Sequence, residues 1–389
     1  MDDLPADPRT AGTVMVGMSG GVDSAVAALL LLRAGFVVHG LHMTNWDEQD
    51  AYCTAAADYQ DARRVCEILG IPLHRADFAE AYRERVFGHF LREYAAGRTP
   101  NPDVLCNREI KFGVCLDHLL RLGGSWIATG HYAGVKHLHT GAQLRKAADQ
   151  SKDQSYFLHA VTRAALGRTL FPLGNLQKSE VRRLAHEAGL PVHDKPDSTG
   201  ICFIGERPFR EFLGRYLRPE PGSILTPEGR RLGEHRGLPF YTLGQRGGLG
   251  IGGRSGAAAA PWFVAAKDPD RNALIVVQSP DHPLLLCDRF EAAQLNWLAE
   301  PAGSGWFDCA VKTRYRQRDL PCRVRRLDEA RVEVALAQPA RAVTPGQYAV
   351  FYSGDVCLGG GVIETTRPRR EALEDCGFTY NRAFTAEGS

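Results

Sequence analysis

No stretch of this sequence is long and apolar enough to cross a bilayer. The longest apolar run extends from Ala25 to Leu32 and ends at Arg33, whereas a membrane-spanning helix needs about 20 residues. The first residues, Met-Asp-Asp-Leu-Pro, are acidic and polar, unlike a signal peptide or an Arg-rich transit peptide. We therefore expect a soluble, cytoplasmic protein without a membrane partner.

An excess of one charge is also nearly absent, because the chain has 47 Lys and Arg residues and 45 Asp and Glu residues, which gives a net charge of +2. This balance excludes a uniformly basic surface but allows a local basic face. None of the ten cysteines stands in a Cys-x-x-Cys pair, which argues against a zinc ribbon or an iron–sulfur site built on such pairs. In a cytosolic chain the cysteines should be thiols, most of them buried, with one or two left for chemistry.

Length and pattern predict more than one domain. With 389 residues, of which 44% are hydrophobic, the chain should fold into two or three packed domains. Its first 130 residues alternate short apolar strands with helices, which is typical of a doubly wound parallel α/β sheet whose ligands bind beyond the carboxyl ends of the strands. We expect strands at 13–18, 36–43 and 126–129 and helices at 23–34, 53–69, 78–94 and 107–122.

The pattern changes near Pro208. An amphipathic helix at 208–217 is followed by short strands with Pro- and Gly-rich turns, and the chain from about residue 281 alternates in the manner of a small β-barrel. We predict four parts: an α/β catalytic domain at 13–207, a small, mostly-β adaptor domain at 208–280, a C-terminal β-barrel at 281–366 and a charged, flexible tail at 367–389.

A glycine-rich string, Met-Ser-Gly-Gly-Val-Asp-Ser at 18–24, joins the first strand to the first helix. Two glycines let the backbone approach a ligand closely, and the hydroxyls and free amides at a helix start suit an anion. It is not a Walker A loop, because no Lys-Ser/Thr follows the glycines. The alternative is a plain Gly-Gly turn with Ser or Asp as the helix N-cap. The whole string, however, resembles the pyrophosphatase loop of enzymes that cleave ATP between the α and β phosphates.

A second glycine string, Gly248-x-Gly250-x-x-Gly253, matches the dinucleotide fingerprint by spacing alone. That fingerprint should follow a strand and open a helix. Here further glycines surround the string and Pro261 follows soon after, so we expect a flexible loop and no nicotinamide cofactor.

Two cysteines stand in strings that could carry chemistry. Cys106 follows the proline-stiffened Arg-Thr-Pro-Asn-Pro-Asp-Val-Leu at 98–105, at or beside a helix start where the helix dipole favours a thiolate. Cys202 lies in the turn-rich Asp-Ser-Thr-Gly-Ile-Cys-Phe at 197–203. From the residues alone, either could be a buried core thiol, and nothing shows that the two meet.

Taken together, these strings resemble the tRNA-specific 2-thiouridylase family from about Val14 to Glu364. The resemblance is carried by GMSGGVDS, YCTAAAD, GRTPNPDVLCN, ATGHY, KDQSYFL, DSTGICFIGERPFREFLGRYL, TLGQR, KTRYRQ and VTPGQ. The departures are the longer charged tail after Glu364 and a compact segment between Asn45 and Tyr52, and neither touches a motif.

The resemblance implies roles for individual residues. The ATP phosphates would be held by Gly17, Met18, Ser19, Gly20, Gly21, Val22, Asp23 and Ser24, and the adenosine pocket would be lined by Met43 and Gly130. The target base would be contacted by Asn101, Pro102 and Asp103, the last as an acid/base or orienting carboxylate. Cys106 would be the nucleophile and Cys202 the persulfide carrier. Contacts to tRNA would come from His131, Lys152, Asp153, Gln154, Arg314, Tyr315 and Gln347.

The reaction that the resemblance implies is an ATP-dependent 2-thiolation of the wobble uridine. The C2 oxygen would be adenylated, with Mg²⁺ aiding the phosphates, and replaced by persulfide-derived sulfur, releasing AMP and pyrophosphate. A Cys106–Cys202 disulfide would remain for a reductant to reopen. The expected partners are tRNA and a sulfur-relay protein or cysteine desulfurase as persulfide donor, and we expect a monomer.

Several of these sites have plainer interpretations. Residues 312–326 carry seven Lys or Arg and one Asp, and Lys312, Arg314, Arg316 and Arg318 alternate, so a strand would present all four on one face. That face could track phosphates or merely protect a strand edge, and Arg314 and Tyr315 would then point to opposite sides. Lys-Asp-Gln at 152–154 could be a helix start capped by Asp153, and His131 could be a satisfied polar group.

Two other functions remain open from the residues alone. A ligase that joins an AMP-activated carbonyl to an amine would use the same loop but would not need the cysteines. A non-catalytic tRNA-binding protein would use only the barrel and would bind RNA regardless of ATP. The loop string argues against the second of these.

Overall fold

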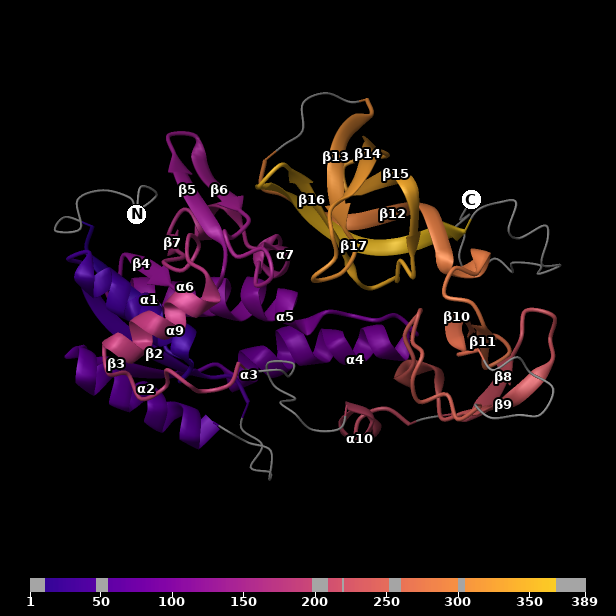
Figure 1. The fold of residues 1–389 in the computed structure, drawn as a ribbon, viewed down its shortest axis with the longest axis horizontal. Helices are drawn as coiled ribbons and strands as arrows, with labels where there is room; N and C mark the ends of the chain where they lie inside the picture. Colours follow the sequence, from indigo (N-terminus) through magenta and orange to yellow (C-terminus); the bar gives the residue numbers. More distant parts are fainter. Residues whose placement is uncertain are drawn as a thin grey trace.

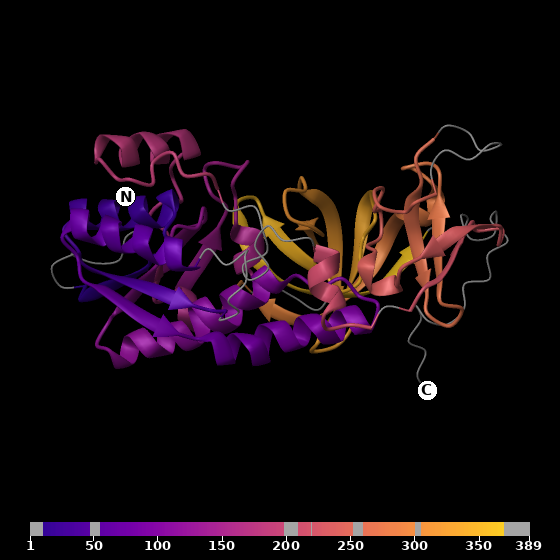
Figure 2. The ribbon, with the colours of Figure 1, turned by 90° about the horizontal axis from the view of Figure 1, so that it is seen from below.

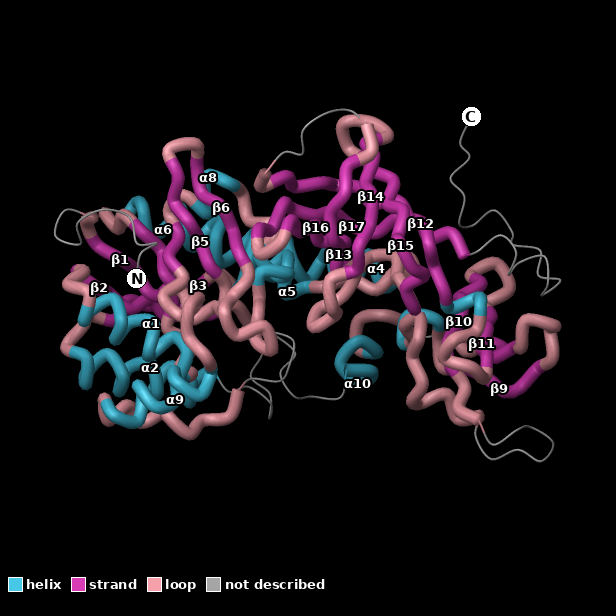
Figure 3. The backbone as a smooth tube through the Cα atoms, turned by 45° about the horizontal axis from the view of Figure 1, so that its top comes forward, coloured by secondary structure: helices cyan, strands magenta, loops and turns pink. Residues whose placement is uncertain are grey.

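The computed structural model describes residues 11–46, 55–197, 209–218, 220–251, 260–299 and 305–368. Within these ranges, three β-sheets lie one after another along an elongated molecule (Figure 1). The N-terminal sheet lies at one end, a four-stranded sheet lies at the other, and a β-barrel stands between them, as the view from below also shows (Figure 2). Helices gather around the N-terminal sheet, whereas strands dominate elsewhere (Figure 3). The predicted fold class is confirmed.

The N-terminal sheet has the order β3-β2-β1-β4-β7, and all neighbouring strands are parallel. Val14 and Val16 pack with the helices on one face, while Met15 between them packs with the helices on the other, so the sheet is covered on both sides. The elements are β1 (Thr13–Gly17), α1 (Val22–Arg33), β2 (Val37–Thr44), α2 (Ala55–Leu69), β3 (Leu73–Asp77), β4 (Trp126–Ala128), β7 (Thr169–Leu170) and α9 (Lys178–Glu187).

A helical arm leaves this sheet, passes below the barrel in Figure 1 and returns. The outgoing half is α3 (Ala79–Tyr82), the π-helical η1 (Arg83–Phe87) and α4 (Gly88–Ala95). The returning half is α5 (Pro102–Leu105), the π-helical η2 (Cys106–Val114) and α6 (Cys115–Arg121). Both predicted helices exist, but the second begins at Pro102, because proline at a first helical position loses no hydrogen bond.

The four-stranded sheet forms the small domain and has the order β10-β11-β8-β9, with only β11 and β8 parallel. Buried Ile224, Val264 and Leu274 share one core with Phe90 of the arm and with Phe212, which lies on the predicted amphipathic helix. The elements are α10 (Phe209–Gly214), β8 (Gly222–Leu225), β9 (Arg231–His235), η3 (Leu238–Phe240), β10 (Phe263–Asp268) and β11 (Ala273–Val277).

The barrel is an antiparallel sheet in the order β12-β15-β14-β13-β16-β17, closed by pairing of β12 with β17. Its interior is filled by apolar side chains such as Phe290, Val324 and Phe351. The elements are η4 (Pro283–Leu285), β12 (Leu286–Trp297), β13 (Phe307–Lys312), β14 (Leu320–Arg326), β15 (Arg331–Arg341), β16 (Tyr348–Ser353) and β17 (Val356–Pro368).

The prediction of a strand through Lys312 and Arg318 is wrong. Strand β13 ends at Lys312, and the chain turns before β14 begins at Leu320. The side-chain oxygen of Gln317 accepts hydrogen bonds from the backbone N–H and hydroxyl of Thr313 at 2.7 and 3.1 Å and closes the turn. Arg316 has a φ of 61°, in the left-handed region outside the usual β range. The alternating cations therefore do not form one strand face, and the predicted opposition of Arg314 and Tyr315 disappears.

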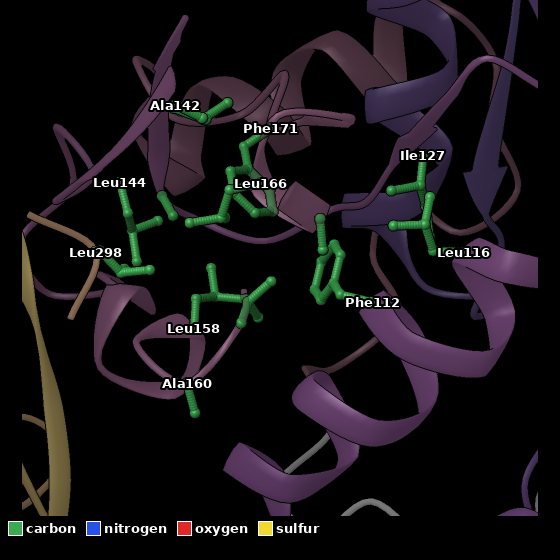
Figure 4. Packing of buried hydrophobic residues seen from close by; sticks show 14 of the residues in the cluster. Phe112, Leu116, Ile127, Ala142, Leu144, Leu158, Ala160, Leu166, Phe171 and Leu298 are labelled. Carbon is green, nitrogen blue, oxygen red and sulfur yellow. The ribbon is translucent and has the colours of Figure 1, made fainter. Parts of the chain in front are cut away.

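A hairpin of the first domain extends the barrel sheet. It is made of β5 (Gly134–Leu138) and β6 (Gly141–Arg145), and Arg145 pairs with Val356 of β17. The helices α7 (Ser155–Leu158) and α8 (Arg163–Leu166) lie beside it. One apolar cluster runs through this contact, so that Leu144 and Leu158 lie near Leu298, which follows the barrel strand β12 (Figure 4). The first domain and the barrel therefore share a core.

Several predicted features lie outside the described residues. They include Cys202 with most of its string, Gly253 of the second glycine string, and almost all of the proposed tail. No helix in the part of the chain that the structure describes is long and apolar enough to span a membrane.

Candidate nucleotide and cysteine site

The glycine loop lies between β1 and α1, at the carboxyl edge of the parallel sheet. Gly20 has a φ of 77°, and a Cβ there would lie 2.8 Å from the Cα of Asp58 and closer still to its carbonyl oxygen. Gly21 is the N-cap of α1, and no side chain caps the helix. The Ser24 hydroxyl instead bonds within the loop, donating to Gly21 O at 3.0 Å. The alternative of a Ser- or Asp-capped turn is therefore wrong, and the first amides of α1 are available to an anion.

The residues predicted to hold adenosine surround this loop. A Cβ on Gly130 would lie 2.6 Å from the backbone of Asp23, so the end of β4 approaches the start of α1 as closely as a glycine allows. A Cβ on Gly17 would lie 3.6 Å from the terminal methyl of Met43. The structure thus brings Gly17, Met43 and Gly130 together beside the loop, where parallel sheets bind ligands.

A network of ion pairs borders the loop; the sequence analysis assigned Lys152 to tRNA and missed Lys178 and Arg182. The ammonium of Lys178 donates to both carboxylate oxygens of Asp23 at 2.7 and 2.8 Å and also lies 2.8 Å from Asp197. Asp197 accepts further bonds from Lys152 at 2.7 Å and Arg182 at 3.0 Å. Burial disfavours the charged form of Asp197, but the bonds from Lys152 and Lys178 outweigh it and lower its pKa to about 2.

Two more observations extend this network. Tyr132 donates its hydroxyl to Asp23 at 2.9 Å, and burial, with the charge of Asp23, raises the pKa of that phenol. On the other side of the loop, Lys195 donates to Gly20 O at 3.0 Å and to Asp58 and Asp61 at 2.7 Å each. One sequence signal could have pointed here: Lys178 opens helix α9, and a cation at a helix N-terminus opposes the dipole and needs an anionic partner.

Cys106 lies in the fifth position of the returning helical run, at the junction of α5 and η2. Its side chain is buried, with 1% exposure, in the cluster that joins the arm to the small domain. Asp103 lies in the first turn of the same run. The side-chain oxygens of Asn101 and Asn107 are buried and have no hydrogen-bond partner among the described residues. Buried acceptors of this kind are uncommon unless a ligand or water completes them.

The residues of the predicted Lys-Asp-Gln contact with tRNA have different surroundings in the structure. Asp153 is only 4% exposed, and its carboxylate accepts bonds from the N–H of Ala147 and Ser155 at 3.1 and 3.2 Å and from Lys312 at 3.3 Å. A contact between this carboxylate and tRNA does not fit such a position. The segment does precede α7, but the N-cap of that helix is Gln154 and no side chain caps it, so Asp153 is not the predicted cap. Gln154 accepts a bond from the N–H of Tyr132 at 2.9 Å and joins the segment to the nucleotide loop.

The other predicted RNA contacts also have internal partners. The Nδ1 atom of His131 lies 2.7 Å from the Thr129 hydroxyl, and burial, with the charge of Lys111, keeps the pKa of the imidazole well below its usual value. Gln347 donates to the carbonyl oxygens of Thr99 and Pro100 at 2.7 and 3.3 Å.

Tyr315 and Arg314 lie on the turn between β13 and β14. The ring of Tyr315 packs 4.4 Å, centroid to centroid, from Phe157 of α7, which in turn packs against α5 and η2. Arg314 is exposed. The turn therefore packs on α7, which in turn contacts the helices that carry Asp103 and Cys106.

Comparison with known proteins gives a consistent result. Three family models match successive parts of the chain: the tRNA methyl transferase HUP domain at residues 12–206, the tRNA methyl transferase PRC-barrel domain at 210–278 and the Aminomethyltransferase beta-barrel domain at 287–363. A relative from Bordetella avium, named tRNA-specific 2-thiouridylase MnmA, is 58% identical over 364 residues, which are 90% of this chain and 98% of the relative. The chain belongs to the tRNA-specific 2-thiouridylase family. A relative of the same name from Alcanivorax borkumensis is 56% identical over 94% of this chain and 100% of its own length. Another from Methylococcus capsulatus is 57% identical over 91% of this chain and 96% of its own length.

This membership confirms the family and the enzyme class, a tRNA sulfurtransferase, that the motifs indicated. Solved structures with a more distant likeness include a 4-thiouridine synthetase–RNA complex with bound ATP, at 19% identity and a TM-score of 0.35 over 53% of this chain and 50% of that one. Another is the U34-tRNA thiolase NcsA from Methanococcus maripaludis, at 19% identity and a TM-score of 0.34 over 55% and 66%.

Proposed function

We propose that this protein is an ATP-dependent sulfurtransferase that replaces the C2 oxygen of the wobble uridine of tRNA by sulfur. The observation that carries the proposal is the agreement, over nine-tenths of the chain, with relatives named tRNA-specific 2-thiouridylase. Two further observations support it: the start of α1 has no side-chain cap, and Phe112 of the helix that carries Cys106 packs 6.0 Å from His131, which follows Gly130 beside the loop.

The phosphates of ATP would bind at the N-terminus of α1, in contact with the amides of the loop. Lys178 and Lys152 now neutralise Asp23 and Asp197, and either ammonium could instead meet a phosphate oxygen. Mg²⁺ is usually bound by one or two carboxylates together with phosphate oxygens and water. The described residues hold no cluster of three or more His, Cys, Asp or Glu side chains that could bind a metal by themselves. Asp23 is the carboxylate of the loop that could bind Mg²⁺ together with the phosphates. Bound there, the ion would stabilise charge that develops on the phosphates.

The target base would enter beside Asn101, Asp103 and Cys106. The two buried amide oxygens of Asn101 and Asn107 lack donors, and a uracil ring offers one at N3. Because Cys106 is only 1% exposed, the base and the persulfide reach it only after the surrounding elements shift. We place the trigger for that shift in tRNA binding, to which the exposed arginines of the turn, Arg314, Arg316 and Arg318, contribute phosphate contacts.

The chemistry follows from the poor leaving ability of a ring oxygen. The C2 oxygen attacks the α-phosphorus of ATP and pyrophosphate leaves, which makes the oxygen part of AMP. Sulfur from a persulfide on Cys202 then attacks C2, and AMP departs with the oxygen. Cys106 attacks the Cys202 sulfur, either after this step, leaving the bond electrons on the ring sulfur, or before it, freeing hydrosulfide as the nucleophile. Both routes end in a Cys106–Cys202 disulfide that a thiol reductant reopens.

The partners of this reaction are tRNA and a sulfur-relay protein or cysteine desulfurase that loads Cys202. We propose that the enzyme acts as a cytoplasmic monomer. His131, which now bonds to Thr129, would reach RNA only by exchanging that partner. Gln347 would keep the bonds that its amide nitrogen donates to Thr99 and Pro100 and would offer its side-chain oxygen to RNA.

The test is a reaction of the purified protein with tRNA, ATP and a persulfide donor, in which 2-thiouridine and AMP are measured. Cys106→Ser and Cys202→Ser should each abolish thiolation, while Cys66→Ser, at a buried cysteine away from these strings, should not. Amine-dependent AMP release with both cysteine variants active would instead indicate a ligase.

A further inference from the structure

Residues 97–100, which we call the junction segment, connect α4 to the helix that carries Cys106. All three domains hold this short stretch. Within the first domain, the N–H of Gly97 bonds to Tyr94 O at 3.0 Å and that of Arg98 bonds to Glu93 O at 2.9 Å. The segment therefore continues the end of α4, where Arg98 also forms an ion pair with Glu93 at 2.6 Å.

The small domain holds the segment through Lys267 of β10. This side chain is 8% exposed, and its ammonium donates to Gly97 O at 2.8 Å. Burial lowers the pKa of Lys267 to about 8, and no carboxylate is among the causes of that shift. A buried ammonium that binds a backbone carbonyl costs folding free energy, so it is expected where the contact serves a purpose other than stability.

The barrel also holds the segment. Thr99 donates its N–H to Pro345 O at 3.0 Å, and the amide of Gln347 donates to Thr99 O and Pro100 O. Arg98 forms an ion pair with Glu364 of β17 at 2.8 Å. The two backbones are in close contact, since a Cβ on Gly346 would lie 2.8 Å from the nitrogen of Thr99.

The segment ends immediately before the residues proposed to act on the base. Asn101 is the N-cap of α5, which contains Asp103 and leads directly into Cys106. A cavity of about 890 Å³ lies beside the segment, lined by residues 95–99, Lys267, Thr344, Pro345 and others. Because there is open space beside it, the segment could shift if Lys267 and Gln347 did not hold it.

We propose that Lys267 and Gln347 are positioning residues, which fix the junction segment from two domains and thereby keep Cys106 and Asp103 in place. The small domain and the barrel then contribute to the chemical step as well as to RNA binding. The role given to Cys106 rests on the proposed function, but the placement of its side chain does not.

The test uses Lys267→Met, which removes the hydrogen-bond donor at similar side-chain volume, and Lys267→Arg, which keeps a donor. Lys136→Met, at an exposed lysine of β5, is the control. Gln347→Glu, which replaces the donating amide by an oxygen, is paired with Gln143→Glu on β6. The first measurement is the rate at which iodoacetamide alkylates Cys106, followed by peptide mass spectrometry, without tRNA or ATP.

We expect Lys267→Met and Gln347→Glu to raise the alkylation rate of Cys106 about tenfold. A tenfold change corresponds to about 1.4 kcal/mol, which is near the net contribution of one hydrogen bond to stability. Lys267→Arg and both controls should match the wild type, and melting temperatures should show that every variant is folded. In the thiolation assay, the same two variants should lower kcat and leave KM for tRNA nearly unchanged.

Unchanged alkylation in folded Lys267→Met and Gln347→Glu would overturn the proposal, and so would a Gln347→Glu defect confined to KM for tRNA. A rise in alkylation in a protein that proves inactive toward tRNA would support the positioning role while refuting the proposed function, so the two are tested separately.

Discussion

Replacing Gly20 by alanine tests whether the shape of the glycine loop, rather than its flexibility, makes the nucleotide site. The substitution has two costs. The residue has a φ of 77°, and an alanine in that left-handed conformation costs about 1–2 kcal/mol. In addition, the new Cβ would lie 2.8 Å from the Cα of Asp58 and nearer still to its oxygen, so backbone must move.

Gly70 provides a matched control. It has a φ of 66° at the end of α2, but a Cβ there would have no atom within 4 Å. Gly70→Ala therefore carries only the conformational cost, and we expect about 1–2 kcal/mol less stability in urea denaturation with unchanged ATP affinity. Gly20→Ala should lose more stability than this and should bind ATP at least about tenfold more weakly, because the loop amides leave their positions.

Urea denaturation and isothermal titration calorimetry with ATP measure the two effects. The reasoning would be refuted if Gly20→Ala and Gly70→Ala gave equal losses of stability and the same ATP affinity, because the contact with Asp58 would then have no consequence.

Three other predictions concern charges and thiols. Lys312→Met should destabilise the protein by about 3–5 kcal/mol, because Asp153 would remain buried without its cation, and adding Asp153→Asn should recover part of the loss in urea denaturation. The pKa of Asp197 lies below its ordinary value, so the charged Asp197 side chain contributes fully to stability above about pH 4 and loses this contribution as the pH falls toward about 2. Over that pH interval, the melting temperature of Asp197→Asn should therefore fall less than the melting temperature of the wild type. After turnover without reductant, non-reducing peptide mapping should find Cys106 joined to Cys202, and a map in which both remain thiols would exclude the resolving step.

Local signals made much of the first domain predictable. The strand at 13–17, the helix after Gly21 and the glycine loop between them depend on residues next to one another in sequence, so apolar runs and glycine positions were sufficient. The barrel and the small domain were predictable only as classes, because their pairings join distant strands such as β12 and β17.

The failures also have physical causes. Alternating cations at 312–318 fit a strand or a turn equally well. The turn is stabilised by the hydrogen bond that the N–H of Thr313 donates to the side-chain oxygen of Gln317. The ion pair of Lys178 with Asp23 joins residues 155 positions apart, and the bond from Gln347 to Thr99 joins residues 248 apart. Periodicity carries no information about such contacts. The motif around Gln347 can be found in the sequence. The sequence does not show that the side chain of Gln347 binds the backbone of Thr99 and Pro100, shortly before Cys106.

The most direct test of the proposed reaction is its stoichiometry. With purified protein, tRNA, ATP and a persulfide donor, we predict one AMP and one pyrophosphate released for each 2-thiouridine found by nucleoside mass spectrometry. Thiolation that proceeds without AMP formation, or AMP formation that never yields 2-thiouridine, would contradict activation of the ring oxygen by the nucleotide.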